Sequence, residues 1–227
     1  METEQHLAGI SARAERLLAG LPAGVELVAA AKGRAAPEVA AAIRGGITRV
    51  GHNYVQEARA MQAALQPSPT WHMIGHLQRN KARQAVRLFD VVETVDSWPL
   101  AQELDARCRA VERVLPVLIE VNSAGEAGKA GVPPEEVAAL ARRVAELDHL
   151  RLDGLMTMGP AGAGPEELRP FFRATRELGE RVREALGGRA GAGVLSMGMS
   201  DSYVVAVEEG ATAVRIGTLL FGPRPGA

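Results

Sequence analysis

The sequence predicts a single (β/α)8 TIM barrel that spans residues 1–227 as one α/β domain, with an extra helix at its N-terminus. Eight short apolar segments of strand length alternate with segments of helical periodicity, which is typical of parallel α/β folds. No Pro/Gly/Ser-rich linker separates them, and the length is a little below the ~250 residues typical of such barrels. A doubly wound open sheet is the rival. No G-x-G-x-x-G follows the first strand, which weakens the case for an open sheet of the dinucleotide-binding type.

The first half of the chain repeats a strand–helix pattern after an opening helix. Residues 4–20 place aliphatic side chains on one stripe, which predicts an amphipathic helix. An apolar run then ends in Lys32, as expected of a buried parallel strand. Pro37 begins the next helix and Gly45 follows its end, which are the usual positions of these residue types. The expected strands are 25–32, 48–51, 71–75 and 91–95, and the expected helices after the first are 37–45, 55–65, 80–88 and one that begins near Ser97.

The second half continues the alternation. The run 114–121 is nearly all apolar, which predicts a buried strand, and a helix opens at Pro133. A long helix ends near Leu186, and Pro170 indicates that it begins near Arg169, because proline disrupts a helix interior. The other expected strands are 152–156, 194–196 and 213–216, and a short helix is expected over 201–208.

Composition excludes several classes of function. The net charge of −1 lacks the positive footprint of a nucleic-acid-binding protein, and 4% aromatic residues are too few for a base-stacking platform. No apolar run approaches membrane-spanning length, and the N-terminus lacks the order of a signal peptide. The single Cys108 fits a reducing compartment. We therefore expect a cytoplasmic protein with no nucleic-acid or membrane partner, and a monomer, with a dimer as the alternative.

Lys32 stands out because lysine is rare in this chain. Of its 26 Lys+Arg residues, only three are lysines, at positions 32, 81 and 129, and the other 23 are arginines. Lysine, unlike arginine, loses its proton when desolvated and then attacks a carbonyl as a free amine. The alternative is a lysine that extends from the strand end to solvent. For Lys81 and Lys129, a place near the rim and a plain surface charge remain equal alternatives.

Polar residues gather at the expected strand ends. Functional side chains of a (β/α)8 barrel collect at the C-terminal ends of its strands, and phosphate is commonly held by the loops after the last two. The residues at or just after those ends are Lys32, His52, Asn53, His76, Asn122, Thr157, Ser196, Arg215 and Thr218.

The last two loops have the residue types of an anion-binding cradle. Gly198 and Gly217 allow close approach of the backbone to a ligand. Hydroxyls come from Ser196, Ser200 and Thr218, and the helix expected near Ser200 presents free N–H groups. The alternative is an ordinary helix cap at Ser200 with turn glycines. Two such loops at the positions that barrels favour for phosphate support the cradle.

A lysine able to form a Schiff base and a phosphate cradle leave two chemistries open: an enzyme of pyridoxal 5′-phosphate (PLP), or an aldolase acting on a sugar phosphate. Arg215 suits a phosphate or a ring, or else a structural carboxylate. The five histidines show no H-x-H or H-E-x-x-H spacing, so we expect no metal site. No G-x-S-x-G indicates a serine hydrolase.

Several motifs, in order along nearly the whole chain, resemble the YggS/PROSC family of pyridoxal phosphate homeostasis proteins. The most specific are W-H-x-I-G-x-L-Q-x-N-K at 71–81 and S-M-G-M-S-D at 196–201. The others are L-V-A-A-A-K at 27–32, G-H-N-Y-V-Q-E at 51–57, V-N at 121–122 with Glu126 and Lys129, G-L-M at 154–156, and V-R-I-G-T at 214–218 with Phe221 and Gly222.

The resemblance implies a barrel similar to the N-terminal domain of alanine racemase, without that enzyme's second domain. Lys32 matches the lysine that holds PLP as a Schiff base, and Arg215 matches a residue beside the pyridine nitrogen. An arginine there disfavours protonation of that nitrogen, so the cofactor becomes a weak electron sink. The remaining matched positions are Ser196, Gly217 and Thr218 at the phosphate, with Gly198 in the same cradle, and Asn53 and His76 beside the ring.

The expected function is therefore PLP carriage and homeostasis with little or no turnover, and PLP-dependent apo-enzymes are candidate acceptors. The chain ends at Ala227, before a domain that would bring a tyrosine to the other face of the cofactor. The alternatives are an amino-acid (alanine) racemase, a Schiff-base aldolase and a purely structural barrel. Two residues depart from the family pattern: His52 replaces a usual glutamate, and Gly33 replaces a usual hydroxyl residue and is expected to loosen the turn after Lys32.

Overall fold

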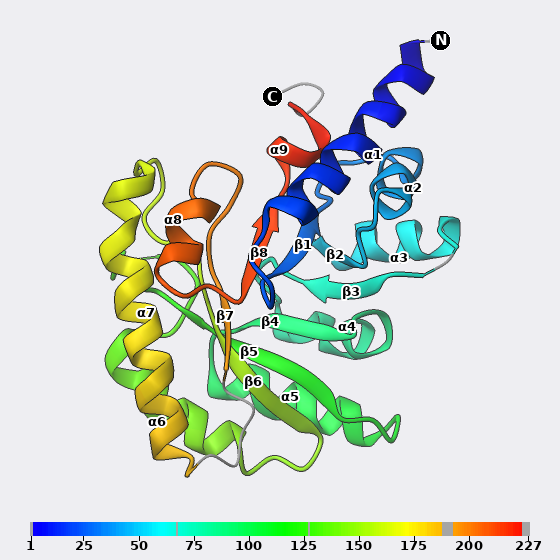
Figure 1. The fold of residues 1–227 in the computed structure, drawn as a ribbon. Coiled ribbons are helices and arrows are strands. Elements are labelled where there is room, and N and C mark those ends of the chain that lie inside the picture. Colours follow the sequence, from blue (N-terminus) through cyan, green and yellow to red (C-terminus); the bar gives the residue numbers. More distant parts are fainter. Residues whose placement is uncertain (1, 67, 127, 188–192, 224–227) are drawn as a thin grey trace.

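Eight parallel strands close into a barrel, each paired with its neighbours in sequence and the last with the first. This confirms the predicted (β/α)8 class in a computed structural model that describes residues 2–66, 68–126, 128–187 and 193–223. Figure 1 shows the strands surrounded by helices. The strands are β1 Glu26–Ala30, β2 Arg49–His52, β3 Thr70–Met73, β4 Val91–Val95, β5 Leu115–Val121, β6 Leu150–Thr157, β7 Val194–Ser196 and β8 Ala213–Ile216.

The helices form the outer layer, and four of those described have a proline at their first or second position. Two features lie outside the predicted pattern: a single 3-10 turn before α4, and the short α9 after the last strand. The elements are α1 Glu2–Gly20, α2 Ala36–Arg44, α3 Val55–Ala64, η1 Arg79–Lys81, α4 Ala82–Leu88, α5 Trp98–Arg109, α6 Pro134–Val144, α7 Pro165–Ala185, α8 Tyr203–Glu208 and α9 Thr218–Phe221.

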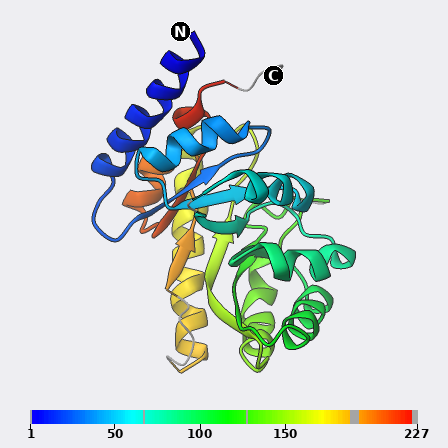
Figure 2. The same ribbon diagram turned by 90° about the vertical axis from the view of Figure 1, so that its right-hand side faces the viewer.

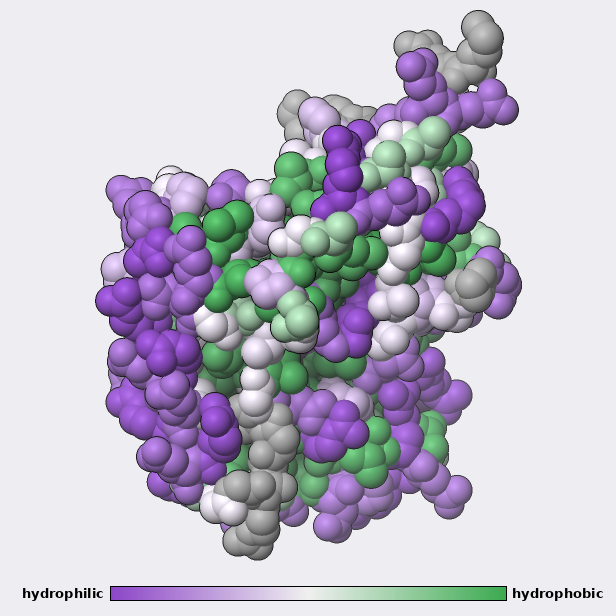
Figure 3. Space-filling model, in the orientation of Figure 1, coloured by the Kyte–Doolittle hydropathy of each residue, from purple (hydrophilic) through white to green (hydrophobic). Residues whose placement is uncertain are grey.

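Helix α7 corrects one prediction. It begins at Pro165 rather than near Arg169, and Pro170 lies inside it. A proline at the first position is favourable, and the Glu167 carboxylate accepts a 2.7 Å hydrogen bond from the Gly164 N–H, which caps the start. Pro170 lies only in the second turn, so it removes one backbone bond without ending the helix. The outer side of α7 is hydrophilic (Figure 3, left edge).

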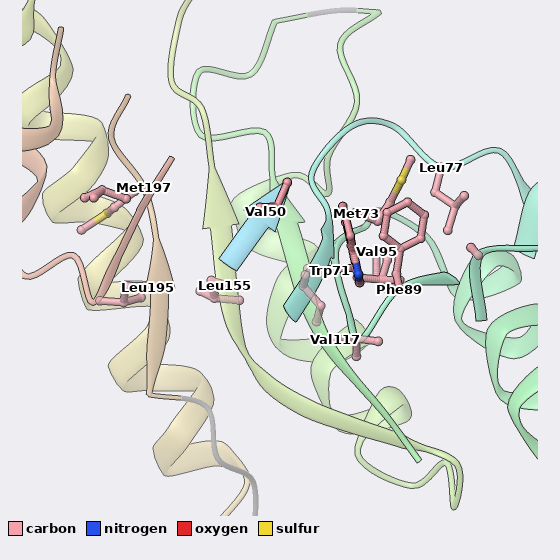
Figure 4. Packing of buried hydrophobic residues seen from close by; sticks show 14 of the residues in the cluster. Val50, Trp71, Met73, Leu77, Phe89, Val95, Val117, Leu155, Leu195 and Met197 are labelled. Carbon is pink, nitrogen blue, oxygen red and sulfur yellow. The ribbon is translucent and has the colours of Figure 1, made fainter. Parts of the chain in front are cut away.

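The hydrophobic core lies mainly between the strands and the helices, because alternate strand residues point outward. Figure 4 shows Met73, Leu77, Phe89 and Val95 together on one side of the sheet, and all four are buried. Cys108 is also buried there, and burial raises the pKa of its thiol to about 11. No helix in the described part of the chain is long and apolar enough to cross a membrane.

The two ends of the described chain meet at the seam of the barrel. β1 pairs with β8 from Glu26 to Ala29, and α1 packs against both α2 and α9. Figure 2 shows α1 lying beside α2 above the strands, near α9. The Arg13 guanidinium donates a 2.7 Å hydrogen bond to the Leu220 carbonyl. The extra N-terminal helix therefore covers the seam and holds the segment that follows the last strand.

Candidate functional site

A cavity of about 240 Å³ opens at the C-terminal ends of β1, β2 and β8 and is lined by Lys32. β1 ends at Ala30, so Lys32 lies just beyond it, half-buried, with its Nζ 5.4 Å from the centroid of the Tyr54 ring. The cavity gathers the predicted residues Lys32, Asn53, Arg215, Gly217 and Thr218. Its other lining residues are Ala30, Arg34, Ile74, Met158 and Met199.

The turn after Lys32 has a backbone that suits glycine. Gly33 has a φ of +68°, a region that side chains with a Cβ rarely adopt. The Arg34 N–H closes the turn with a 3.0 Å bond to the Ala31 carbonyl. Glycine takes this conformation without strain, so Gly33 suits the turn, and the expectation that it loosens the turn stays a prediction.

Asn53 approaches the neighbouring strand because the facing residue is a glycine. A Cβ added to Gly75 would lie 2.6 Å from the Asn53 Cα, so only glycine leaves room. His76 lies farther out, with its side chain 56% exposed and its Nδ1 3.1 Å from Asp96 Oδ2. It lines adjoining cavities instead of the Lys32 cavity. The two residues predicted beside the ring therefore differ in position: Asn53 lines the cavity together with Lys32, and His76 lies at the rim.

His52 lies in the layer between barrel and helices. Its ring is fully buried and stacks on Trp71 at a centroid distance of 5.8 Å. Neither ring nitrogen has a hydrogen-bond partner among the described residues, and Glu57 Oε2 lies 3.8 Å from Nδ1. Burial lowers the pKa of His52 despite the nearby Glu57 carboxylate. The structure therefore places this departure from the family pattern outside the cavity.

Two of the residues predicted to bind phosphate, Gly217 and Thr218, line the cavity at the start of α9. Thr218 is exposed at the cavity, and a Cβ on Gly217 would lie 3.3 Å from the Ala30 carbonyl oxygen, so glycine allows β8 and β1 to end close together. The Ser200 hydroxyl accepts hydrogen bonds of 3.2 Å from the N–H groups of Gly217 and Leu219. Ser200 thus joins the loop after β7 to the loop after β8.

Two predicted cradle residues have other surroundings. Gly198 has a φ of +90°, and a Cβ there would meet Ala206 at 2.5 Å, so this glycine allows packing against α8. The Ser196 hydroxyl is fully buried inside the barrel and bonds Glu93 and Arg215. Neither residue lines the cavity. Arg215, which does, is itself only 4% exposed.

A second cavity of about 550 Å³ adjoins the first and shares four lining residues with it: Asn53, Ile74, Met158 and Met199. Glu120, at the end of β5, lines this cavity, and its Oε2 is buried without a hydrogen-bond partner in the described chain. Burial, together with the Asp96 carboxylate, raises the pKa of Glu120 to about 7. A comparable cavity of about 590 Å³ at the start of β6 is lined by no lysine among the described residues.

Sequence reasoning named Lys32, Asn53, Arg215, Gly217 and Thr218, which line the cavity, but it did not name Arg34, Glu93 or Glu120. The two glutamates had a readable signal, since each is the one carboxylate in a largely apolar strand. Arg34 had none, because its role depends on the chain end that it contacts. No group of three or more His, Cys, Asp or Glu side chains in the described ranges is arranged to hold a metal ion.

Comparisons with known proteins agree on one family. Residues 6–225 match the alanine racemase N-terminal domain family. The chain is 42% identical over 204 residues to the pyridoxal phosphate homeostasis protein of Pseudomonas aeruginosa, covering 89% of this chain and 86% of that one. The homologue from Aquifex aeolicus is 42% identical over 180 residues, covering 79% and 78%.

Solved structures give the same picture. PipY of Synechococcus elongatus without PLP has a TM-score of 0.89 and 37% identity, covering 94% of this chain and all of that one. Its structure with PLP bound has a TM-score of 0.87 and 36% identity. Alanine racemase from Bacillus anthracis, at 18% identity and a TM-score of 0.76, shares the fold over 57% of its length. The chain described here belongs to the family of pyridoxal phosphate homeostasis proteins, within the alanine racemase N-terminal domain family.

Proposed function

We propose that this chain binds PLP as a Schiff base on Lys32 and serves PLP homeostasis and carriage in the cytoplasm, with little or no catalytic turnover. The single observation that carries the proposal is that Lys32 and the Gly217–Thr218 turn line one cavity of about 240 Å³. An amine and a phosphate-type turn, carried by the adjacent strands β1 and β8 into one cavity, suit a small phosphorylated aldehyde. The names of the relatives and the PLP-bound PipY support this cofactor.

The proposal treats residues 1–227 as one PLP-binding domain and gives a role to five of the residues that line the cavity. Lys32 supplies the amine, Gly217 and Thr218 bind the phosphate, and Asn53 lies beside the ring. Arg215 faces the ring nitrogen. Ser196, Gly198 and His76 lie outside the lining, so we assign them indirect roles: Ser196 supports Arg215, Gly198 supports the loop, and His76 stands at the entrance.

Weak turnover follows from the charge of Arg215. A guanidinium beside the ring nitrogen opposes its protonation, because like charges repel, and an unprotonated ring withdraws electrons poorly. A cofactor held in this way suits transfer to another protein better than carbanion chemistry. PLP-dependent apo-enzymes are the proposed acceptors.

The test is an absorption spectrum of the purified protein with PLP, before and after borohydride, for wild type and Lys32→Ala. Wild type should show a visible band that borohydride removes, and mass spectrometry should place the reduced adduct on the peptide containing Lys32. Lys81→Ala is the matched control, since Lys81 is a half-buried lysine of a neighbouring cavity and should leave the band unchanged. A band that survives in Lys32→Ala but not in Lys81→Ala would contradict the assignment.

Turnover is tested separately with D- and L-alanine in the presence of PLP. The proposal expects interconversion at or near the background of the Lys32→Ala variant. Rapid racemisation that depends on Lys32 would replace carriage by catalysis as the principal activity.

A further inference from the structure

Four buried polar side chains from four strands form a chain of hydrogen bonds inside the barrel, beneath the Lys32 cavity. They are His72 on β3, Glu93 on β4, Ser196 on β7 and Arg215 on β8. His72 Nδ1 lies 2.7 Å from Glu93 Oε1, and Ser196 Oγ lies 2.6 Å from Glu93 Oε2. Arg215 reaches the same Ser196 oxygen at 2.7 Å. The interior of a (β/α)8 barrel is usually filled by branched aliphatic residues, so this series of hydrogen-bonded polar side chains is a distinct feature.

The directions of these hydrogen bonds follow from the chemistry of the groups. Arginine has donors only, so Ser196 Oγ accepts from Arg215, and the one hydroxyl hydrogen goes to Glu93. Burial opposes ionisation of Glu93, but the contacts from His72, Arg215 and Ser196 outweigh it, so the pKa of Glu93 is lowered. An ionised Glu93 takes a hydrogen from His72 Nδ1 as well. The Glu93 carboxylate therefore accepts hydrogen bonds from two donors, His72 Nδ1 and Ser196 Oγ.

Arg215 is fixed from two sides. One terminal nitrogen donates to Ser196 Oγ, and the other donates at 2.8 Å to the Thr157 carbonyl. The guanidinium also lines the Lys32 cavity. Of its five N–H donors, two bond acceptors within the described ranges, which leaves the others to serve a ligand in the cavity. The other titratable group close to the guanidinium is Glu120 on β5, itself beside Asp96 and His76.

A buried ion pair of this kind is weak support for stability, since apolar residues of similar volume often do as well. Its more informative property is orientation, because a guanidinium bonded on two edges has little freedom. We propose that Glu93, acting through Ser196, is a positioning residue that fixes Arg215 as the donor to the ring nitrogen of bound PLP. Glu93 and Ser196 thereby control the protonation behaviour of the bound cofactor. This inference rests on the proposed function and replaces the predicted contact of Ser196 with phosphate.

The test uses Glu93→Gln, which keeps the size and removes the charge, and Ser196→Ala, which removes the bridge and keeps the charge. Two quantities are measured on PLP-loaded protein: the rate of PLP release, and the pH midpoint of the absorbance change of the bound cofactor. Each variant should release PLP about two- to tenfold faster, as expected for the loss of one buried hydrogen bond, and should shift the midpoint. The matched control is Glu103→Gln, a glutamate that accepts a hydrogen bond from Arg107 on the surface of the same helix.

The double variant decides whether the two residues act through the same arginine. Its shift should be no larger than that of the stronger single variant, because residues that act as a unit are not additive. Full additivity, or loaded variants with wild-type midpoints and release rates, would overturn the inference while leaving PLP binding intact. If Glu93→Gln does not fold, Ser196→Ala alone still decides by these two measurements. Wild type that takes up no PLP would overturn the proposed function and this inference with it.

Discussion

Two glutamates near Arg215 differ in their surroundings. Glu93 is fully buried but accepts hydrogen bonds on both oxygens, so its pKa is lowered. Glu120 has a buried oxygen without a partner in the described chain and lies near the Asp96 carboxylate, so its pKa is raised to about 7. Two carboxyl groups whose pKa values are shifted in opposite directions are suited to different tasks in one site. Here the lowered pKa of Glu93 favours its charged form, and the pKa of Glu120 is raised to about 7.

The pH dependence of stability follows from Glu120. Its folded-state pKa of about 7 exceeds the ordinary 4.5, so ionisation of Glu120 lowers the free energy of unfolding. This penalty is absent below pH 4.5, grows as pH rises and is complete above pH 7. That penalty is on the order of 3 kcal/mol. Glu120→Gln should therefore be more stable than wild type at pH 8 and similar at pH 4.5, as measured by urea unfolding across that range. The stability of Glu103→Gln should follow that of wild type at each pH. If the free energy of unfolding of Glu120→Gln changes with pH in parallel with that of wild type, the prediction is refuted.

At the scale of single residues, the sequence predicted identity better than orientation. Lys32 and Thr218 were predicted from their residue types at strand ends, and both line the cavity. The surroundings of Ser196 and Gly198 could not be predicted, because a hydroxyl or glycine near a strand end faces either the cavity or the packing layer according to the register. Hydrogen bonds with Glu93 and Arg215, on two other strands, fix the direction of the Ser196 side chain.

At the scale of elements, β7 depends on a close backbone contact. The strand has three residues, and Gly154 of β6 pairs with Val194 at its start. A Cβ on Gly154 would lie 1.9 Å from the Val194 carbonyl oxygen, so the two strands cannot keep this spacing with any other residue. The sequence predicted both strands from their apolar character, but such an approach between backbones leaves no periodic signal.

Gly154→Ala should therefore destabilise the protein by about 1–3 kcal/mol or more, the usual range for overpacking. It should also weaken PLP binding, because β7 carries Ser196. Thermal unfolding and PLP titration measure the two effects. Gly20→Ala is the control, since a Cβ there has no neighbour within 4 Å among the described residues and should leave both unchanged. An unaltered melting temperature in Gly154→Ala would show that β7 shifts freely.

At the scale of the whole molecule, arginines tie the last segment to the first helices. Arg34 donates to the carbonyls of Gly222 and Pro223, and its guanidinium lies 5.3 Å from the centroid of the Phe221 ring. Alternating periodicities predicted the order of strands and helices and the closed barrel. They did not predict α9, because four residues are too few for a periodic signal and long-range contacts hold it in place.

Arg34→Ala should loosen α9, because the buried Arg34 guanidinium donates to the Gly222 and Pro223 carbonyls that follow this helix. The affinity for PLP should fall about tenfold or less, since these hydrogen bonds act on the turn that lines the cavity and not on PLP itself. Hydrogen exchange of residues 217–223 should accelerate, and Lys32 should still form its borohydride-sensitive band. Arg44→Ala, an exposed arginine at the end of α2, serves as the control. Unchanged exchange in Arg34→Ala would mean that α1 alone holds the segment.

The seam between the first and last strands has a consequence for how the protein is made. Lys32 is synthesised long before the Gly217–Thr218 turn. A growing chain therefore carries the amine well before the turn, and the two come together only when β8 pairs with β1. Under the proposed function, bound PLP would bridge the two strands that close the barrel, so its binding depends on that closure.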